Sequence, residues 1–279
     1  MLADVVITPS SREQEGAHAN MNMHLFQPPE IERGFRLPRA GVLNATVIDV
    51  VKLDRDVRRA MYALFERYYL ATSPQMFARD LASKDTVILL HDEENRLCGF
   101  STLATCTMNV GGETIRIVFS GDTIVERAHW GSHALAFAWI RHIGKIAAQA
   151  PGIPLFWLLI VKGHRTYRYL PAWMLDFTPD WRHPADTWLT ALKDATATAR
   201  FGTAYDREAG VLRFAASQGH LAPEWAGVTP REALRPDVRF FLERNPGYAR
   251  GDELVCLGEL AASNLRPLMR RLFLQGAAS

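Results

Sequence analysis

Cysteine is scarce in this chain. Its 279 residues include three cysteines, Cys98, Cys106 and Cys256, which lie far apart and show no metal-ligand spacing. An odd number of widely separated cysteines argues against a disulfide scaffold and is typical of reduced thiols. We therefore predict a cytoplasmic protein without structural disulfides.

Long hydrophobic runs are also missing. No stretch approaches the roughly 20 consecutive apolar residues that a transmembrane helix needs. Residues 1–4 lack the basic start and apolar run of a secretory signal, so none is expected. A basic amphipathic helix, interrupted by Pro267, is predicted over residues 259–274. We expect it to pack on its own domain and predict no membrane contact.

Neither sign of charge dominates. The chain has 32 Lys and Arg against 30 Asp and Glu, a formal net charge of +2, and no long basic run. This balance gives no electrostatic reason to expect a nucleic-acid partner. The sequence also contains no Gly-x-Ser-x-Gly nucleophile elbow and no His-Glu-x-x-His zinc motif. Neither a serine hydrolase nor a metal site is therefore predicted.

Composition and patterning divide the chain into three parts. Residues 1–43 are predicted to be an N-terminal extension, because they are polar and contain Pro28 and Pro29. Residues 44–180 are predicted to form the core, and residues 181–279 a C-terminal addition packed on it. In the addition we expect helices over 185–200 and 236–243, a hairpin joining 203–205 to 211–214, and a short strand over 254–257.

The core carries an unusual order of predicted elements. A first strand over 46–51 precedes two helices, capped by Asp54 and by Ser73 with Pro74. Three strands, a helix opening at Trp130, another strand and a short helical segment follow. The strands are expected at 86–91, 97–108, 115–125 and 155–161. Because a helix N-terminus offers unpaired N–H groups, the junction after residue 125 is a candidate anion site.

This order resembles that of the GNAT superfamily of N-acyltransferases, over about residues 44–177. In that superfamily the matching junction follows the pattern V-x-x-x-x-R/Q-G-x-G-x-G/A and holds the pyrophosphate of coenzyme A. Here residues 125–135 read VERAHWGSHAL, so Val125 and Gly131 fall where the pattern wants them. Trp130 replaces Arg or Gln, and His133 and Leu135 replace later small residues. The resemblance implies an α+β fold, a mixed twisted sheet flanked by helices, which splays between strands 115–125 and 155–161.

The resemblance also implies a thioester donor, either acyl-CoA or the acyl-phosphopantetheine arm of an acyl carrier protein, and no metal. Arg165 and Arg168, in the segment after the 155–161 strand, would suit its phosphate groups; the alternative is that they are solvated. The predicted donor-binding residues are Val125, Trp130, Gly131, Ser132, His133, Arg165 and Arg168.

Three residues are candidates for proton transfer. Asp122, near the end of a predicted strand, could accept a proton from an attacking amine, or could merely accept backbone N–H groups where the sheet splays. Tyr167 and Tyr169 could each protonate a departing thiolate. Alternate residues of a helix point about 200° apart, so only one hydroxyl can face the cleft, and we favour Tyr167. The alternative is that Tyr167 packs in the core.

Two functions follow from these observations. The first is an acyltransferase that moves an acyl group from a coenzyme A or carrier-protein thioester to an amine, on a small molecule or lipid-like acceptor. The second is a non-catalytic GNAT-like module that binds a ligand or partner in the same cleft. The missing glycines favour the second, because glycine lets the backbone approach phosphate closely.

Overall fold

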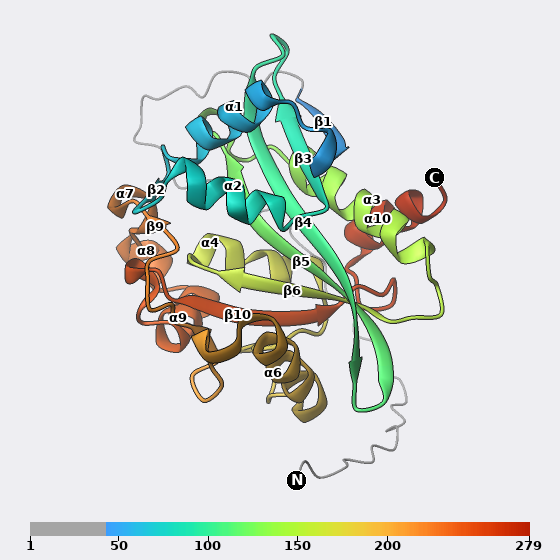
Figure 1. The fold of residues 1–279 in the computed structure, drawn as a ribbon. Coiled ribbons are helices and arrows are strands. Elements are labelled where there is room, and N and C mark those ends of the chain that lie inside the picture. The colour runs from blue at the N-terminus through green and yellow to red at the C-terminus, as the bar shows by residue number, and fades with distance from the viewer. Residues whose placement is uncertain (1–42) are drawn as a thin grey trace.

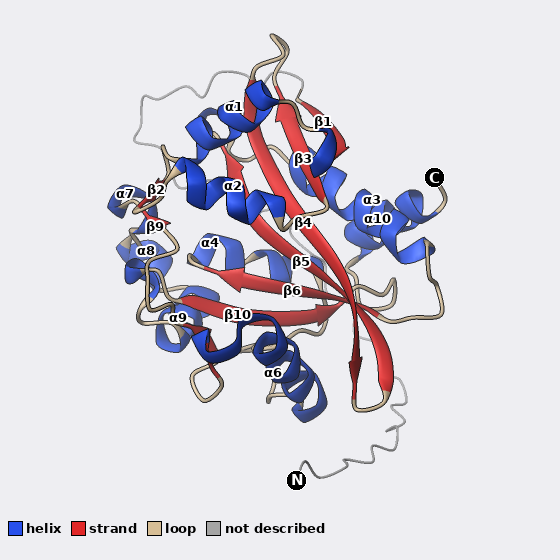
Figure 2. Ribbon diagram, viewed as in Figure 1, coloured by secondary structure: helices blue, strands red, loops and turns tan. Residues whose placement is uncertain are grey.

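A single mixed sheet organises the computed structural model, which describes residues 43–279 (Figures 1 and 2). β5 and β6 run parallel, and every other pairing in the sheet is antiparallel. In spatial order the strands are β1 (Asn44–Asp49), β3 (Thr86–His91), β4 (Leu97–Val110), β5 (Glu113–Val125), β6 (Leu155–Val161), β10 (Glu253–Glu259), β8 (Val211–Leu212) and β7 (Tyr205–Asp206). A separate small sheet pairs β2 (Tyr69–Leu70) with β9 (His220–Leu221).

Helices cover both faces of the large sheet (Figure 2). One face packs against α1 (Arg55–Phe65), α2 (Pro74–Ala82) and α6 (Thr187–Phe201). The other packs against α3 (Ala134–Ala148), α5 (Tyr169–Trp173), α9 (Pro236–Arg244) and α10 (Pro267–Ala277). The short helices are α4 (His164–Tyr167), α7 (Pro223–Ala226) and α8 (Pro230–Ala233), with 3-10 turns at Val50–Lys52, Arg127–His129, Gly202–Ala204 and Tyr248–Arg250.

Strand β6 is buried on both of its faces, and its sequence reflects this. Leu155, Trp157 and Leu159 belong to the core on the α3 and α10 face, whereas Phe156 and Leu158 belong to the core on the α6 face. A strand buried on both faces reads as a continuous apolar run rather than an alternating one. This explains why LFWLLIV contains no polar residue.

The predicted splay is confirmed by the strand register. β5 pairs with β6 from Arg116–Leu155 to Ser120–Leu159, where Trp157 Nε1 donates a hydrogen bond of 2.7 Å to Ser120 Oγ. Beyond Ser120, β5 continues beside β4 alone, while β6 continues beside β10. The two central strands therefore part toward their carboxyl ends, and the mixed α+β, GNAT-like arrangement predicted from the sequence is present.

Local signals located several elements correctly. Asp54 and Ser73 cap α1 and α2, their side chains accepting hydrogen bonds from the backbone N–H groups of Val57 and Met76. Strands β3 and β6 occupy the predicted residues, and the predicted hairpin is present, with β8 inside its predicted segment and β7 extending one residue beyond its own. These elements depend on short-range chemistry, which the sequence displays directly.

Four predicted boundaries were wrong. The helix after β5 begins at Ala134, four residues after Trp130, because Trp130 is extended and Gly131 has φ +92°, and neither conformation is helical. The last helix begins at Pro267, the first-turn position where proline needs no N–H, instead of being interrupted there. The segment from residue 254 is part of a seven-residue strand, β10, at the centre of the sheet. The first strand begins at Asn44 and ends at Asp49.

No helix among residues 43–279 is both long enough and apolar enough to span a membrane.

Candidate active site

The splay opens into a large cavity of about 1680 Å³. Its walls include the separated ends of both central strands, Gly121–Val125 of β5 and residues 159–160 of β6. The cavity also reaches the loop before α3 on one face of the sheet and α2 and α6 on the other. It therefore connects the two faces through the gap between the strands. A ligand could lie across the sheet with its reactive group at β5.

Asp122 lies in this gap and lines the cavity. Burial is the main reason that its pKa is raised to about 7, and the negative charge of Asp80 adds to the effect. Lys162 and Lys84 act in the opposite sense but do not cancel it. Among the described residues, no hydrogen bond or ion pair holds the Asp122 carboxylate. A carboxylate that titrates near neutral pH and is otherwise uncommitted suits a general base.

The charges of two ion pairs act on Asp122. Lys84 Nζ, from a side chain that is 0% exposed, lies 2.5 Å from Asp80 Oδ1. On the opposite side Lys162 Nζ lies 3.5 Å from Glu253 Oε1, and burial raises the pKa of that glutamate. These pairs place charges of both signs near the base: Asp80 and Glu253 raise the pKa of Asp122, and Lys84 and Lys162 lower it.

The backbone of β5 offers a donor at the same place. The N–H of Glu126 bonds to the carbonyl of Cys98 on β4, and β4 and β5 are antiparallel here. Because alternate residues of a strand point their backbone groups to opposite edges, the N–H of Val125 points away from β4, toward the splay. The Val125 carbonyl points the same way, since it accepts a hydrogen bond of 2.8 Å from Trp130 Nε1. The Val125 N–H is thus placed to hold an oxyanion.

The loop before α3 contributes the predicted donor-binding residues. Gly131 has φ +92°, a left-handed conformation that favours glycine, and a Cβ added there would meet no atom within 4 Å. Ser132 Oγ accepts a hydrogen bond from the N–H of Ala134, and His133 is the residue before the helix. Gly131, Ser132 and His133 line the cavity, as do Val125 and Trp130. The structure therefore brings all five together around the start of α3.

Trp130 has a structural explanation for replacing Arg or Gln. Its indole N–H donates a hydrogen bond to the Val125 carbonyl. Its ring packs edge-on against the Trp225 ring, with the two centroids 5.5 Å apart. The Arg165 guanidinium lies over the Trp130 ring, with its Cζ atom 5.8 Å from the ring centroid. Trp130 thus connects the loop to Trp225 in the C-terminal part of the chain.

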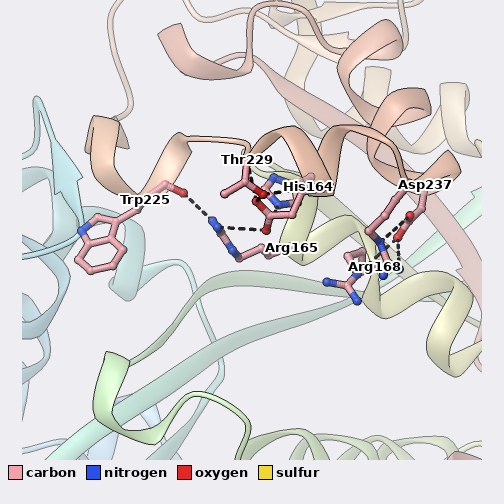
Figure 3. A network of polar contacts seen from close by, with 8 residues as sticks. His164, Arg165, Arg168, Trp225, Thr229 and Asp237 are labelled. Atoms are coloured by element: carbon pink, nitrogen blue, oxygen red, sulfur yellow. Dashed lines mark hydrogen bonds and ion pairs between the residues drawn. The ribbon is translucent and has the colours of Figure 1, made fainter. Parts of the chain in front are cut away.

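Arg165 and Arg168 are held at the cavity wall by residues of the C-terminal part (Figure 3). Arg165 donates to the Trp225 carbonyl at 2.8 Å and lies 3.4 Å from Glu232. Arg168 Nε lies 3.4 Å from Asp237. Burial and the nearby Arg235 lower the pKa of Arg168. Each arginine is therefore positioned by a carboxylate, with the Arg165 side chain still 36% exposed.

Glu232 anchors this network. Burial opposes its ionisation, but hydrogen bonds from Thr229 and His164 outweigh burial and lower its pKa to about 2. Thr229 and Glu232 form a capping box at the start of α8. Because Glu232 also contacts Arg165, the cap of α8 fixes a guanidinium at the cavity. The sequence TPRE at residues 229–232 predicts the capping box, but it does not predict the contact between Glu232 and Arg165.

Positive charge predominates in the cavity wall. Ten lysine and arginine residues line it, against five aspartate and glutamate residues. The cations are Arg79, Lys84, Lys162, Arg165, Arg168, Arg182, Arg200, Arg231, Arg235 and Arg266. An excess of guanidinium groups suits a ligand with several phosphates. Among the residues described, no group of three or more His, Cys, Asp and Glu side chains is arranged to hold a metal ion.

The two candidate tyrosines have different environments. Tyr167 is fully buried, and its hydroxyl donates a hydrogen bond of 2.7 Å to the Pro179 carbonyl. Tyr169 lines the cavity, and burial raises its pKa. Arg168 separates α4 from α5, and Pro171 lies inside α5. Our preference for Tyr167 therefore does not fit the structure, and of the two candidates it is Tyr169 that lines the cavity.

Phenylalanine variants should separate these roles. Tyr167→Phe should lower the free energy of unfolding by about 1–3 kcal/mol, because it leaves the Pro179 carbonyl unpaired in the core, with turnover unchanged. Tyr169→Phe should leave the melting temperature unchanged and lower kcat about 10²-fold, the low end of the loss of a general acid. Thermal melts and single-turnover kinetics measure the two effects. Equal kcat in both variants and the wild type would remove the acid role.

Sequence reasoning missed three charged residues of the site. Lys84 follows α2, Asp80 lies in α2, and Glu253 begins β10. Each is a single charged residue at the end of an element, a pattern that ordinarily indicates a solvated surface. Only the tertiary packing places them in one cavity with Asp122. No signal in the sequence distinguishes them from exposed charges.

Comparison with known proteins gives structural neighbours at low similarity. No family model matches the chain, and no curated protein matches it. A conserved protein of unknown function from Enterococcus faecalis V583 is 13% identical, with 48% of this chain and 33% of that chain covered and a TM-score of 0.36. A GNAT-family N-acetyltransferase from Escherichia coli in complex with CoA is 14% identical, with 46% and 68% covered and a TM-score of 0.34. An acetyltransferase from Trypanosoma brucei is 14% identical, with 52% and 97% covered and a TM-score of 0.34. This chain spans about a third of the length of the Enterococcus faecalis protein. At these values the matches do not assign an activity, which is inferred below from the geometry of this chain.

Proposed function

We propose that this protein is an N-acyltransferase, which moves an acyl group from a thioester to an amine. The observation that carries the proposal is Asp122. Its carboxylate lies in the splay of the sheet, titrates near neutral pH and has no bonded partner among residues 43–279. A binding module has no need of such a group, whereas deprotonation of an ammonium requires one.

The donor is a thioester with an anionic carrier. Its phosphates would lie at the start of α3, near Gly131 and Ser132, with Arg165 and Arg168 beside them. The charge balance of the cavity wall supports this placement, and so does the positive end of the α3 dipole. The pantetheine arm would then pass into the gap between β5 and β6, which brings the thioester to Val125.

The chemistry needs three contributions from the chain. Asp122 takes a proton from the acceptor ammonium, so that the amine nitrogen can attack the thioester carbonyl. The Val125 N–H holds the negative charge that develops on the carbonyl oxygen. As the C–N bond forms and the C–S bond breaks, Tyr169 donates its proton to the leaving thiolate. The nitrogen loses its second proton at this stage, and that proton passes through solvent to restore the Tyr169 phenol. The acceptor amine thus becomes an amide and the donor becomes a free thiol.

The proposal is tested by thioester consumption. The protein is incubated with acetyl-, medium-chain and long-chain acyl-CoA, and separately with an acyl carrier protein, each with a panel of amines; released thiol is measured. Thermal shift measures donor binding in the same samples, since a ligand at a hundred times its dissociation constant stabilises a protein by about 2.7 kcal/mol. Binding without thiol release in any sample would favour the non-catalytic module. The two donor series distinguish coenzyme A from a carrier protein.

Gly131 tests the donor site. Gly131→Val should weaken donor binding about tenfold, the equivalent of about one charge-assisted hydrogen bond, because its side chain would stand among N–H groups that face phosphate. Gly112→Val is the matched control. Gly112 also has a positive φ, +85°, and open space around it, but it lies in the turn between β4 and β5 and does not line the cavity. Equal donor affinity in the two variants would mean that the anion binds elsewhere.

A further inference from the structure

Tyr69 lines the cavity, and the mechanism above does not use it. It belongs to β2 in the small sheet, and its ring stacks on that of Phe65 with the two centroids 4.5 Å apart. The side chain is half-buried, and none of the described residues forms a hydrogen bond with its hydroxyl. Packing therefore holds the ring, whereas the hydroxyl has no part in holding it.

Charged neighbours place Tyr69 close to Asp122. Lys162 Nζ lies 5.5 Å from the centroid of the Tyr69 ring and 3.5 Å from Glu253 Oε1. The charges of Lys162 and Glu253 both act on Asp122. Burial raises the pKa of Tyr69, and the negative charges of Asp122 and Glu253 add to the effect. Tyr69, Asp122 and the ion pair of Lys162 with Glu253 thus form one cluster in the cavity.

The packing of Tyr69 does not require a hydroxyl. A phenylalanine ring would stack on Phe65 and lie beside Lys162 in the same way. Lys162 is itself committed, because its Nζ atom also donates a hydrogen bond of 3.2 Å to the Gln218 carbonyl. The phenol stays protonated at neutral pH, so it adds an uncharged oxygen that can accept a hydrogen bond near the base. A cationic group brought to Asp122 is the partner that this oxygen suits.

We propose that Tyr69 binds the acceptor amine: its hydroxyl oxygen accepts a hydrogen bond from one N–H of the ammonium, while Asp122 takes the proton of another. This rests on the acyltransferase function proposed above and adds a binding residue to its acceptor site. A primary ammonium has three N–H protons. One passes to Asp122 and one to solvent during transfer, and the third remains in the amide product. The contact with Tyr69 can therefore persist from the bound amine to the product.

A contact that is equally strong in the ground state and the transition state contributes to binding and leaves kcat unchanged. Tyr69→Phe should therefore raise both the dissociation constant and the KM of the amine by about tenfold to a hundredfold, as for a lost hydrogen bond to a charged group. The kcat, the donor affinity and the melting temperature should stay at the wild-type values. This split distinguishes Tyr69 from Tyr169, whose loss lowers kcat.

The experiment titrates benzylamine, phenethylamine and tyramine calorimetrically into the full chain with a non-hydrolysable acyl-CoA analogue present. Aromatic amines are chosen because Phe65 and Phe77 also line the cavity. The same amines serve as acceptors in the thiol-release assay, which measures KM and kcat. Tyr62→Phe is the matched control, because Tyr62 packs against Phe77 with centroids 5.6 Å apart but does not line the cavity. This control should behave as the wild type.

The outcomes separate this inference from the proposed function. The role of Tyr69 is overturned if no amine binds the wild type, if Tyr69→Phe binds amines as tightly as the wild type, or if it weakens donor and amine equally. Acyl transfer with an unchanged amine KM in Tyr69→Phe would leave the acyltransferase function intact. Tyr69-dependent amine binding without any thiol release would support the amine site and refute the acyl transfer.

Discussion

Asp122→Asn is expected to lower turnover by about 10²–10⁴-fold while donor affinity stays unchanged. Asparagine is nearly isosteric with aspartate but cannot accept the proton of the acceptor ammonium. Single-turnover rates with a confirmed donor and acceptor measure the loss, and calorimetry with coenzyme A measures donor affinity. Near-normal turnover in this variant would mean that the amine is deprotonated by another group or enters the site already neutral.

The pH dependence gives an independent check on the same residue. Since burial and Asp80 raise the pKa of Asp122 to about 7, the base is protonated and inactive below that pH. The wild-type rate should therefore rise as pH increases through about 7. In the asparagine variant this acidic limb should flatten, because the titrating group is gone.

The stability of the folded protein should fall as pH rises through about 7, whereas the rate should increase. Folding raises the pKa of Asp122 above its ordinary value of 3.8, so the native state holds this proton more tightly than the unfolded chain. The contribution of this group to stability is full below about pH 4 and is lost as pH rises through about 7. The melting temperature of Asp122→Asn, relative to the wild type, should therefore increase from pH 5 to pH 8. A constant difference across this range would mean that folding does not shift the pKa.

Gly144→Val is expected to have the largest effect on stability. Gly144 on α3 and Gly276 on α10 lie where the two helices cross. A Cβ at Gly144 would overlap the Phe273 carbonyl oxygen, and one at Gly276 would overlap the Arg141 carbonyl oxygen. Because the neighbouring atoms are backbone, relief requires the helices to separate. We expect a loss of at least about 3 kcal/mol in the free energy of unfolding, the upper end of overpacking costs.

Chemical denaturation of Gly144→Val and Gly276→Val measures this loss. Gly152→Ala is the control: its φ is not positive, and an added Cβ would meet no atom within 4 Å. This variant should remain within about 0.5 kcal/mol of the wild type. If Gly144→Val unfolded at the same denaturant concentration as Gly152→Ala, the close approach of α3 and α10 would be wrong.

Much of the fold is determined by local sequence. Asp54 and Ser73 specify the first turns of α1 and α2, because a side-chain oxygen at the cap satisfies a free N–H within three residues. The apolar run of β6 specifies a strand covered on both faces, and the order of elements predicts the splay beside it. Such features depend on neighbours in the chain, so the sequence alone is enough to predict them.

Local sequence features predicted only part of the candidate active site. Asp122 and the loop from Trp130 to His133 could be identified because they lie at the end of one strand. The choice between Tyr167 and Tyr169 could not, since it depends on which ring packs in the core, where the Tyr167 hydroxyl bonds to the distant Pro179 carbonyl.

Only the tertiary structure decided the electrostatics of the cavity. Lys84 lies just after α2 and Glu253 begins β10; the two are far apart in the chain, but both line the cavity beside Asp122. The pKa of a carboxylate and the availability of a guanidinium depend on distances and burial in three dimensions. The sequence determined which residues could carry the chemistry. The packing decided that Asp122 lies in the splay of the sheet with a raised pKa and no hydrogen-bond partner among the described residues.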